Sequence, residues 1–390
     1  MINVAFSLPY DREKWIGGYN YILNIMISLS MSKIENIRPV LFIGDDVDSD
    51  SLVPFSNIKN VLIVREPYFN RKKKSIRLLV ALLTGKDFLA LRIFKSHNIN
   101  VVFETAQFHG ISFNIPIISW IPDFQHKHMP EKFNFYSYWK REFGFKLQTS
   151  TRRAILLSSE DARNDCEKFY PKSINFTNVA HFAIFDLTKN NSKKDFDDLC
   201  IKYSIPKSFF FLPNQFWTHK NHITVIEALK ILKTKNLDIT IVSTGAQSDP
   251  RNVNYFQELV KKIEDYGILN SIKILGLIPY KDINLLLLNC KALINPSFFE
   301  GWSTTVEEGK STKTPLILSS IAVHIEQSCD NAFFFDPNSP QELAFLLEKY
   351  SAYSRTELQK ILNLSNTNYE LNLLTFINRV SEVVIKVAQK

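Results

Sequence analysis

The chain has 390 residues, of which 45% are hydrophobic and 22% charged, and its formal net charge at pH 7 is +8. This composition is typical of a soluble globular protein, and the length predicts about two domains. No apolar run reaches the roughly 18 to 20 residues of a membrane span, and residues 1–8 lack the basic start of a signal peptide. The four cysteines are scattered without a CxxC spacing, which predicts reduced thiols in a cytoplasmic protein.

The positive charge suits three kinds of partner: nucleic acid, an anionic membrane or an anionic substrate. The sequence has no RNP-like motif, zinc-finger spacing or Arg-rich tract, so we expect no nucleic-acid partner. Its densest basic stretch, RKKK at 71–74 with Arg77, precedes the apolar run LLVALLTG. This pattern is typical of a basic amphipathic helix that lies on anionic lipid. A solvated loop and helix face is the alternative interpretation.

The first half of the chain alternates apolar runs with helical patterns, notably at 19–32 and 75–94. Alternating strands and helices predict a parallel sheet covered on both faces. The candidate strands are residues 2–7, 40–43, 61–64, 101–104, 116–121 and 154–158.

A charged, apolar-poor stretch containing KNNSKKDFDDLC then predicts a linker at 186–207 that includes a short helix. A second alternation follows, with candidate strands at 209–212, 239–243, 272–275, 291–295, 316–319 and 332–335. The prediction is an α/β protein with two Rossmann-like doubly wound domains, residues 1–185 and 208–368, that face a central cleft. Ligands of such sheets bind beyond the carboxyl ends of the strands.

The most informative stretch is INPSFFEGWSTTVEEGKSTKTPLILSS, at 294–320, which predicts strand, loop, helix and strand. Ser303 and Thr304 are suitable N-cap residues, and a helix N-terminus can hold a phosphate. Glu300 then lies at the mouth of the helix and Glu308 on its second turn. Carboxylates accept hydrogen bonds from hydroxyls, so the pattern suits a nucleotide sugar. A capped surface helix with dipole-compensating acids is the alternative.

These residues resemble the E-x7-E signature of retaining glycosyltransferases of the GT-B fold, in the group 1 or GT4 family and its polysaccharide-assembly branch. Glu300 and Glu308 are the two acids, Trp302 takes the place of the usual Phe, and Gly309 that of the usual Ala. The resemblance implies that Glu300 contacts the donor sugar and Glu308 the ribose. It also implies that a final helix at 369–390 returns to the first domain. The other residues that it assigns to donor binding are Gly301, Trp302, Ser303, Thr304 and Thr305.

Two further segments match the family's donor site. In FLPNQFWTHKNHITVIEAL, at 211–229, Lys220 takes the place of a diphosphate-binding lysine, and Gln215 stands where Arg is usual. Because Gln carries no charge, Lys220 has to neutralise more of the diphosphate. Gly17 and Gly18 follow the first strand and match the glycine-rich loop that faces the diphosphate. A surface lysine and a flexible turn are the alternative interpretations.

The segment ISWIPDFQHKHMPEKF, at 118–133, follows a strand of the first domain. By resemblance, Asp123 is the first candidate for a group that approaches the transferred sugar, and His126 is the second. His109, after the preceding strand, is a further candidate. Histidines that satisfy local backbone groups are one alternative, and a metal site of Asp123, His126 and His128 is another.

Two short polar motifs predict local structure, a turn and a helix cap, rather than a functional site. The overlapping D-x-D matches between Asp46 and Asp50 predict a solvated turn, because they lie in a polar loop without a partner motif. Ser159 and Glu160 predict helix capping.

The resemblance predicts an enzyme that moves a sugar, mannose or another hexose, from a GDP- or UDP-linked donor to a hydroxyl of a lipid-linked or growing cell-surface polysaccharide. Catalytic residues would be Asp123, His126 and Glu300, with no cofactor and no metal. O-antigen or capsule synthesis at the cytoplasmic face of the inner membrane is the expected setting. A nucleotide-sugar epimerase or phosphorylase of similar fold and a catalytically silent sugar-nucleotide-binding subunit are the alternatives.

Overall fold

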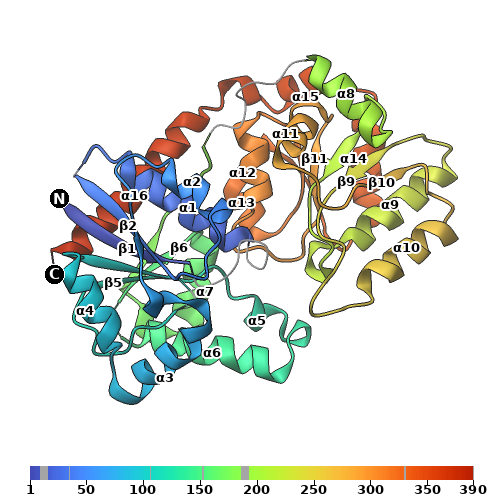
Figure 1. Cartoon of the computed structure of the whole chain (residues 1–390). Coiled ribbons are helices and arrows are strands. Elements are labelled where there is room, and N and C mark those ends of the chain that lie inside the picture. Colours follow the sequence, from blue (N-terminus) through green and yellow to red (C-terminus); the bar gives the residue numbers. More distant parts are fainter. Residues whose placement is uncertain are drawn as a thin grey trace. The chain divides into compact units, whose positions relative to one another are not determined.

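A computed structural model describes residues 1–8, 16–34, 36–105, 107–151, 153–185, 193–328 and 331–389. Its contacts divide the chain into two compact units, Met1–Ala183 with Glu370–Lys390 and Ile184–Tyr369 (Figure 1). Each unit contains one parallel sheet with helices, which confirms the predicted fold class. Residues 186–192 of the predicted linker lie outside the described residues. The rest of it includes helix α8 (Lys193–Tyr203), which packs Phe196 and Leu199 into the core of the second unit.

The first unit is built on a seven-stranded sheet of order β3-β2-β1-β4-β5-β6-β7. All neighbouring strands run parallel. Six of the strands match the predicted ones, and only β7 was missed because its three residues show no apolar run. The strands are β1 (Ile2–Ser7), β2 (Ile37–Ile43), β3 (Leu62–Arg65), β4 (Val101–Thr105), β5 (Ile117–Trp120), β6 (Ala154–Leu157) and β7 (Thr177–Val179).

One predicted helix of the first unit is two helices in the structure. The helical pattern over 75–94 forms two helices, because Gly85 ends the first of them in a left-handed conformation with φ of 78°. The helices are α1 (Ile16–Ser30), α2 (Val53–Ser56), α3 (Lys74–Thr84), α4 (Phe88–Ser96), α5 (Gln125–His128), α6 (Phe135–Thr149) and α7 (Glu160–Phe169), with α16 (Tyr369–Ala388) from the end of the chain.

Helix α16 joins the first unit through its apolar side chains. Phe376 is buried and meets Phe182 edge to face, with ring centroids 5.6 Å apart. Val380 and Val384 are buried one and two turns further along. Every helix in the described part of the chain is too short or too polar to cross a bilayer.

The second unit holds a six-stranded parallel sheet of order β10-β9-β8-β11-β12-β13. Side chains alternate across it: Phe210 and Leu212 pack on one face, and Phe209 and Phe211 on the other. All six strands were predicted. They are β8 (Phe210–Leu212), β9 (Ile241–Ser243), β10 (Ile272–Ile274), β11 (Leu293–Asn295), β12 (Leu316–Ser319) and β13 (Phe333–Phe335).

Helices cover both faces of this second sheet. Helices α9, α10 and α14 contribute to the core on one face, and α8, α11 and α12 to the core on the other. Besides α8, the helices are α9 (His222–Thr234), α10 (Tyr255–Asp265), α11 (Tyr280–Asn289), α12 (Thr304–Ser311), α13 (Ala322–Ser328), α14 (Pro340–Ser351) and α15 (Arg355–Ile361).

Candidate functional site

Two neighbouring strands of the second sheet deliver the candidate site. Strands β8 and β11 lie side by side where the strand order reverses, and ligands of such sheets bind at this point. The loops that follow the two strands are tied together: the Asn214 side chain donates to Oδ1 of Asn295 over 3.1 Å. The Phe298 amide donates to the carbonyl of His219 over 2.8 Å. Residues 81 and 79 positions apart in sequence therefore meet here.

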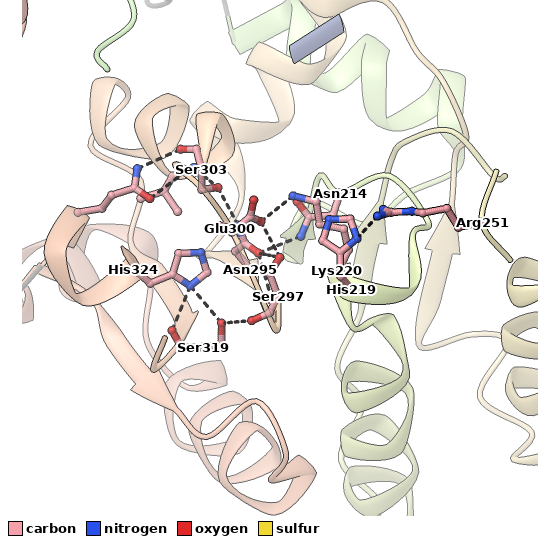
Figure 2. A network of polar contacts seen from close by, with 12 residues as sticks. Asn214, His219, Lys220, Arg251, Asn295, Ser297, Glu300, Ser303, Ser319 and His324 are labelled. Carbon is pink, nitrogen blue, oxygen red and sulfur yellow. Dashed lines mark hydrogen bonds and ion pairs between the residues drawn. The ribbon is translucent and has the colours of Figure 1, made fainter. Parts of the chain in front are cut away.

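The loops bring together Lys220 and Glu300, which the sequence analysis assigned to the donor diphosphate and the donor sugar. Nζ of Lys220 lies 2.6 Å from Oε1 of Glu300, and the Ser297 hydroxyl donates to the same oxygen over 2.7 Å (Figure 2). Only 16% of the Lys220 side chain and 9% of the Glu300 side chain are exposed. A positive and a negative group are thus fixed together at the carboxyl edge of the sheet.

The surroundings keep Glu300 ionised. Burial by itself would raise the pKa of this carboxyl, but the charge of Lys220, followed by those of His324 and His219, holds it down at about 2. His324 is fully buried, and burial lowers its own pKa to about 4. Its Nδ1 lies 3.0 Å from the carbonyl of Ser319, so this nitrogen carries the proton. Glu300 is therefore an acceptor at neutral pH.

Helix α12 begins directly after Glu300 and its loop, as predicted. Ser303 is the N-cap, and its hydroxyl accepts a hydrogen bond from the Val306 amide. The same hydroxyl accepts from Asn295 over 2.9 Å (Figure 2). Gln327 accepts from the Ser303 amide over 3.1 Å. These contacts fix the positive end of the helix, where Thr304 and Thr305 form the first turn.

Glu308 lies on the second turn of α12, as predicted. Burial raises the pKa of this half-buried carboxyl to about 7, while a hydrogen bond of 3.0 Å from the Tyr280 hydroxyl lowers it. The preceding residue, Glu307, is buried and holds Lys310 at 2.8 Å and Gln327 at 3.1 Å. Of the two neighbouring acids, only Glu308 is thus placed to accept hydrogen bonds from a ligand.

Gly309 follows Glu308, where the resemblance leads us to expect alanine. A Cβ at this position would lie 2.6 Å from Cδ2 of Leu316 and 3.5 Å from Cδ1 of Leu293. Both leucines are buried in the core beneath α12. The smaller residue is therefore explained by the close approach of the helix to the sheet.

Other donor-site candidates lie in the same two loops. Gln215, Gly301 and Trp302 are all half-buried. The carbonyl of Gln215 accepts a hydrogen bond from the Trp217 amide, which shapes the loop before Lys220.

The sequence analysis missed several residues that support Lys220. Asp249 accepts from the amide and the hydroxyl of Thr218, over 2.9 and 3.0 Å. Arg251 approaches Nδ1 of His219 at 3.2 Å. His219 could have been found from its position beside Lys220. Asp249 and Arg251 follow a different strand, and no local pattern marks them.

In the first unit, the structure separates the residues considered for catalysis and for a metal site. Asp123 is partly exposed and accepts from Arg141 over 2.5 Å. His126 is fully buried, with Nε2 3.3 Å from both Glu142 and the hydroxyl of Tyr170. His128 pairs with Asp165 at 2.6 Å. The three side chains have different partners, and in the described residues no group of three potential ligands is arranged for a metal ion.

Burial favours the neutral form of two candidate histidines, His126 and His109. It lowers the pKa of each to about 4. His109 lies among Asp87, Glu104 and Phe94. Both rings are enclosed by protein, so a role for either in proton transfer stays a prediction. Asp123 is the more accessible of the catalytic candidates in this unit.

The remaining candidates of the first unit lie near the ends of strands. Gly17 and Gly18 fall within the first turn of α1, which begins at Ile16, three residues earlier than expected. Gly17 is exposed, and a Cβ there would meet nothing within 4 Å. Asp48 accepts from the amide and hydroxyl of Ser51, which confirms the predicted turn. Ser159 caps α7, as predicted.

Comparisons with known proteins agree with this geometry. The family model "Glycosyl transferases group 1" matches residues 201–363, which confirms the resemblance for this part of the chain. A relative, the O-antigen chain mannosyltransferase RfbU of Salmonella typhimurium, is 24% identical over 199 residues. That match spans 50% of this chain and about half the length of the relative (51%).

Solved structures share the fold of the whole chain. A glycosyltransferase from Rickettsia africae superposes with a TM-score of 0.68 and 16% identity, covering 99% of this chain and 96% of its own. Anabaena HepE in complex with UDP-glucose gives a TM-score of 0.68 and 15% identity, covering 99% and 98%. The two-sheet architecture is therefore the GT-B fold.

Proposed function

Because residues 201–363 match the group 1 glycosyl transferases and the fold is GT-B, we propose that this protein is a retaining glycosyltransferase. It transfers mannose or another hexose from a GDP- or UDP-linked donor to a hydroxyl of a lipid-linked or growing cell-surface polysaccharide. The name of RfbU, an O-antigen chain mannosyltransferase, supports the sugar and the pathway. The UDP-glucose complex of HepE supports the donor class.

The arrangement around α12 is the observation that carries this proposal. An ionised carboxylate, Glu300, lies before the capped N-terminus of the helix, and a second carboxylate, Glu308, lies one turn beyond it. The ammonium of Lys220 is held beside Glu300. A diphosphate fits the positive helix end and the lysine, while the two acids accept hydrogen bonds from hydroxyls of the sugar and of the ribose.

In the reaction, the bond between the sugar C1 and the β-phosphate oxygen breaks, and its electron pair stays on the phosphate. The acceptor oxygen forms the new bond to C1 on the same face, and its proton passes to the leaving phosphate. Lys220 and the N-terminus of α12 stabilise the charge that develops on the diphosphate, without a metal or a cofactor. Glu300 fixes the orientation of the sugar. Asp123 assists on the acceptor side, with His126 as the second candidate.

A panel of nucleotide sugars tests the donor. We expect a GDP- or UDP-hexose to raise the thermal midpoint of the protein more than TDP- or ADP-sugars do, because binding to the native state stabilises it. Incubation with that donor alone should then release the nucleoside diphosphate slowly. Interconversion of the sugar would instead identify an epimerase, and saturable binding without turnover would identify a silent subunit. Either of these results would overturn the proposal.

A further inference from the structure

A buried acid beside the candidate site has no part in the proposed chemistry. Glu307 lies on α12 directly before Glu308, and only 1% of its side chain is exposed. Its Oε1 accepts from Lys310 over 2.8 Å and from Gln327 over 3.1 Å, and its Oε2 accepts from the Tyr369 hydroxyl over 3.2 Å. A buried carboxylate with both oxygens engaged in this way is a fixed acceptor for the side chains around it.

Gln327 transmits this constraint to the start of α12. It lies on α13, which packs beside α12 (Figure 1). Its Nε2 donates to the carbonyl of Ser303 over 3.1 Å, and its Oε1 accepts from the amide of the same residue over 3.1 Å. Because one side chain bonds both backbone groups of the N-cap residue, the direction in which the helix begins depends on Gln327.

Glu307 determines which way the Gln327 amide faces. A carboxylate only accepts hydrogen bonds, so Nε2 of Gln327 has to turn toward Glu307. The reversed amide would present its oxygen to two acceptors, the carboxylate and the Ser303 carbonyl, and would leave the Ser303 amide without an acceptor. Glu307 therefore selects the one orientation of the amide that satisfies both backbone groups of Ser303.

Tyr369 brings the two ends of the second unit into the same network. This unit comprises Ile184–Tyr369, so the chain passes between the units beside these two residues. The Ile184 amide donates to the Tyr369 hydroxyl over 2.8 Å, and that hydroxyl donates to Glu307. Burial, followed by the charge of Glu307, raises the pKa of Tyr369, so the hydroxyl keeps the proton that it donates. A series of three hydrogen bonds therefore runs from both chain crossings to Ser303.

We propose that Gln327, Glu307 and Tyr369 are positioning residues of the donor site, and we call the three together the Ser303 clamp. The clamp occupies the Ser303 amide, so the amides of Thr304 and Thr305, which have no acceptor within the helix, are those left for the donor diphosphate. Donor affinity consequently depends on a hydroxyl at the point where the chain leaves the second unit. This inference rests on the proposed function, because it takes the N-terminus of α12 as the diphosphate site.

Two variants test the clamp. Tyr369→Phe removes a single oxygen atom and decides the matter if Gln327→Leu, which removes both hydrogen bonds to Ser303, does not fold. Hydrogen exchange of the peptide that contains Ser303 and Val306 reports on the helix start, because their amides are bonded to Gln327 and to the Ser303 hydroxyl. We expect exchange to be about threefold faster in Tyr369→Phe and about tenfold faster in Gln327→Leu. The Kd of the nucleotide that binds the wild type, GDP or UDP, should rise by similar factors.

Tyr266→Phe is the matched control. The Tyr266 hydroxyl donates to Glu227 over 2.7 Å, and its ring packs on the face of the sheet opposite to α12. This variant loses the same kind of hydrogen bond in the same unit, so it should lower the thermal midpoint about as much as Tyr369→Phe without changing the exchange or the Kd.

Unchanged exchange at the helix start in Tyr369→Phe, or an equal change in Tyr266→Phe, would overturn the proposal. Wild-type Kd values in both clamp variants would overturn the positioning role alone. A wild type that binds neither GDP nor UDP would instead overturn the proposed function, and the positioning role with it.

Discussion

Glu300 and Lys220 form a preorganised pair. The ammonium and the Ser297 hydroxyl lie 2.6 and 2.7 Å from Oε1 of the carboxylate. The resulting pKa of about 2 leaves Glu300 charged throughout the physiological range. A buried charge needs such partners, because an isolated carboxylate would lose its hydration without compensation.

Replacing Glu300 by Gln should lower kcat by a factor on the order of 100 to 1,000, because a neutral amide cannot replace the charged acceptor that orients the sugar. The thermal midpoint should also fall, because Lys220 then lacks its charged partner, although Gln keeps the shape of the side chain. The control is Glu264→Gln, on the exposed side of α10. Steady-state transfer assays measure both variants, and unchanged turnover in Glu300→Gln would refute its role.

Glu308 should make donor binding dependent on pH. Its pKa of about 7 lies well above the usual value of 4.5, because burial favours the neutral form. In the proposed donor complex the ionised carboxylate accepts hydrogen bonds from the ribose, so donor affinity should rise as pH increases through 7 and fall about tenfold per pH unit below it. Titration calorimetry with the nucleoside diphosphate between pH 5.5 and 8.5 measures this slope.

The Glu308→Gln variant is the control for that profile. It should bind the nucleotide more weakly at pH 8 and lose the dependence around pH 7, while retaining turnover at saturating donor. A profile around pH 7 that persists in this variant would assign the titration to another group.

Among the elements, α12 connects the fold to the site. Ser303 caps this eight-residue helix and also accepts from Asn295, so the strand end, the loop and the helix are one hydrogen-bonded assembly. The direction of the helix N-terminus is therefore fixed by contacts to the sheet rather than by helix propensity.

Ser303→Ala should cost about 1 kcal/mol of stability and also weaken donor binding, because the cap positions the amides of the helix N-terminus. Ser339→Ala is the matched control: Ser339 caps α14 by accepting from the Glu342 amide at 3.2 Å. It should cause a similar loss of stability without changing donor affinity. Thermal unfolding and nucleotide titration of both variants check this, and equal donor affinities would contradict it.

Gly309→Ala should destabilise the protein despite the better helix propensity of alanine. The added methyl, 2.6 Å from Leu316, overpacks a buried contact at a cost of about 1 to 3 kcal/mol, against a gain of about 1 kcal/mol from propensity. Gly144→Ala on α6 is the control, because a Cβ there meets nothing within 4 Å and only the gain applies. Thermal midpoints should move in opposite directions, and a rise in both would contradict the packing argument.

For the molecule as a whole, the end of the chain is part of the first unit's core. The chain leaves the second unit near Tyr369, and α16 then buries Phe376 against Phe182. The stability of the first unit consequently depends on a segment that follows the entire second unit in the sequence.

Phe376→Ala should lower the stability of the first unit by about 3 to 5 kcal/mol, because it opens a cavity beneath α16. Nucleotide binding by the second unit should stay unchanged below the unfolding temperature. Leu374→Ala, on the exposed side of the same helix, is the control and should change neither property. Calorimetric unfolding with and without nucleotide measures both, and loss of nucleotide affinity in Phe376→Ala alone would contradict this assignment.

Local sequence patterns were sufficient to predict the fold class, twelve of the thirteen strands found in the described residues, and the start of α12. Apolar runs, the helical period and the cap at Ser303 are properties of neighbouring residues, and strands and helices follow from them. The split between α3 and α4 at Gly85 was missed, although the residues TGKD at 84–87 interrupt the apolar pattern there and Asp87 caps α4. The spacing of Glu300 and Glu308 placed both acids correctly on loop and helix.

Only the three-dimensional arrangement shows which of these groups meet and how they are charged. Lys220 pairs with Glu300 because their strands are neighbours in the sheet, although 80 residues separate them. His126 is enclosed by Glu142 and Tyr170, and the aromatic side of α6 faces solvent. Burial and electrostatic interaction act through space, so residues distant in the chain determine the pKa values, the accessible candidates and the exposed faces.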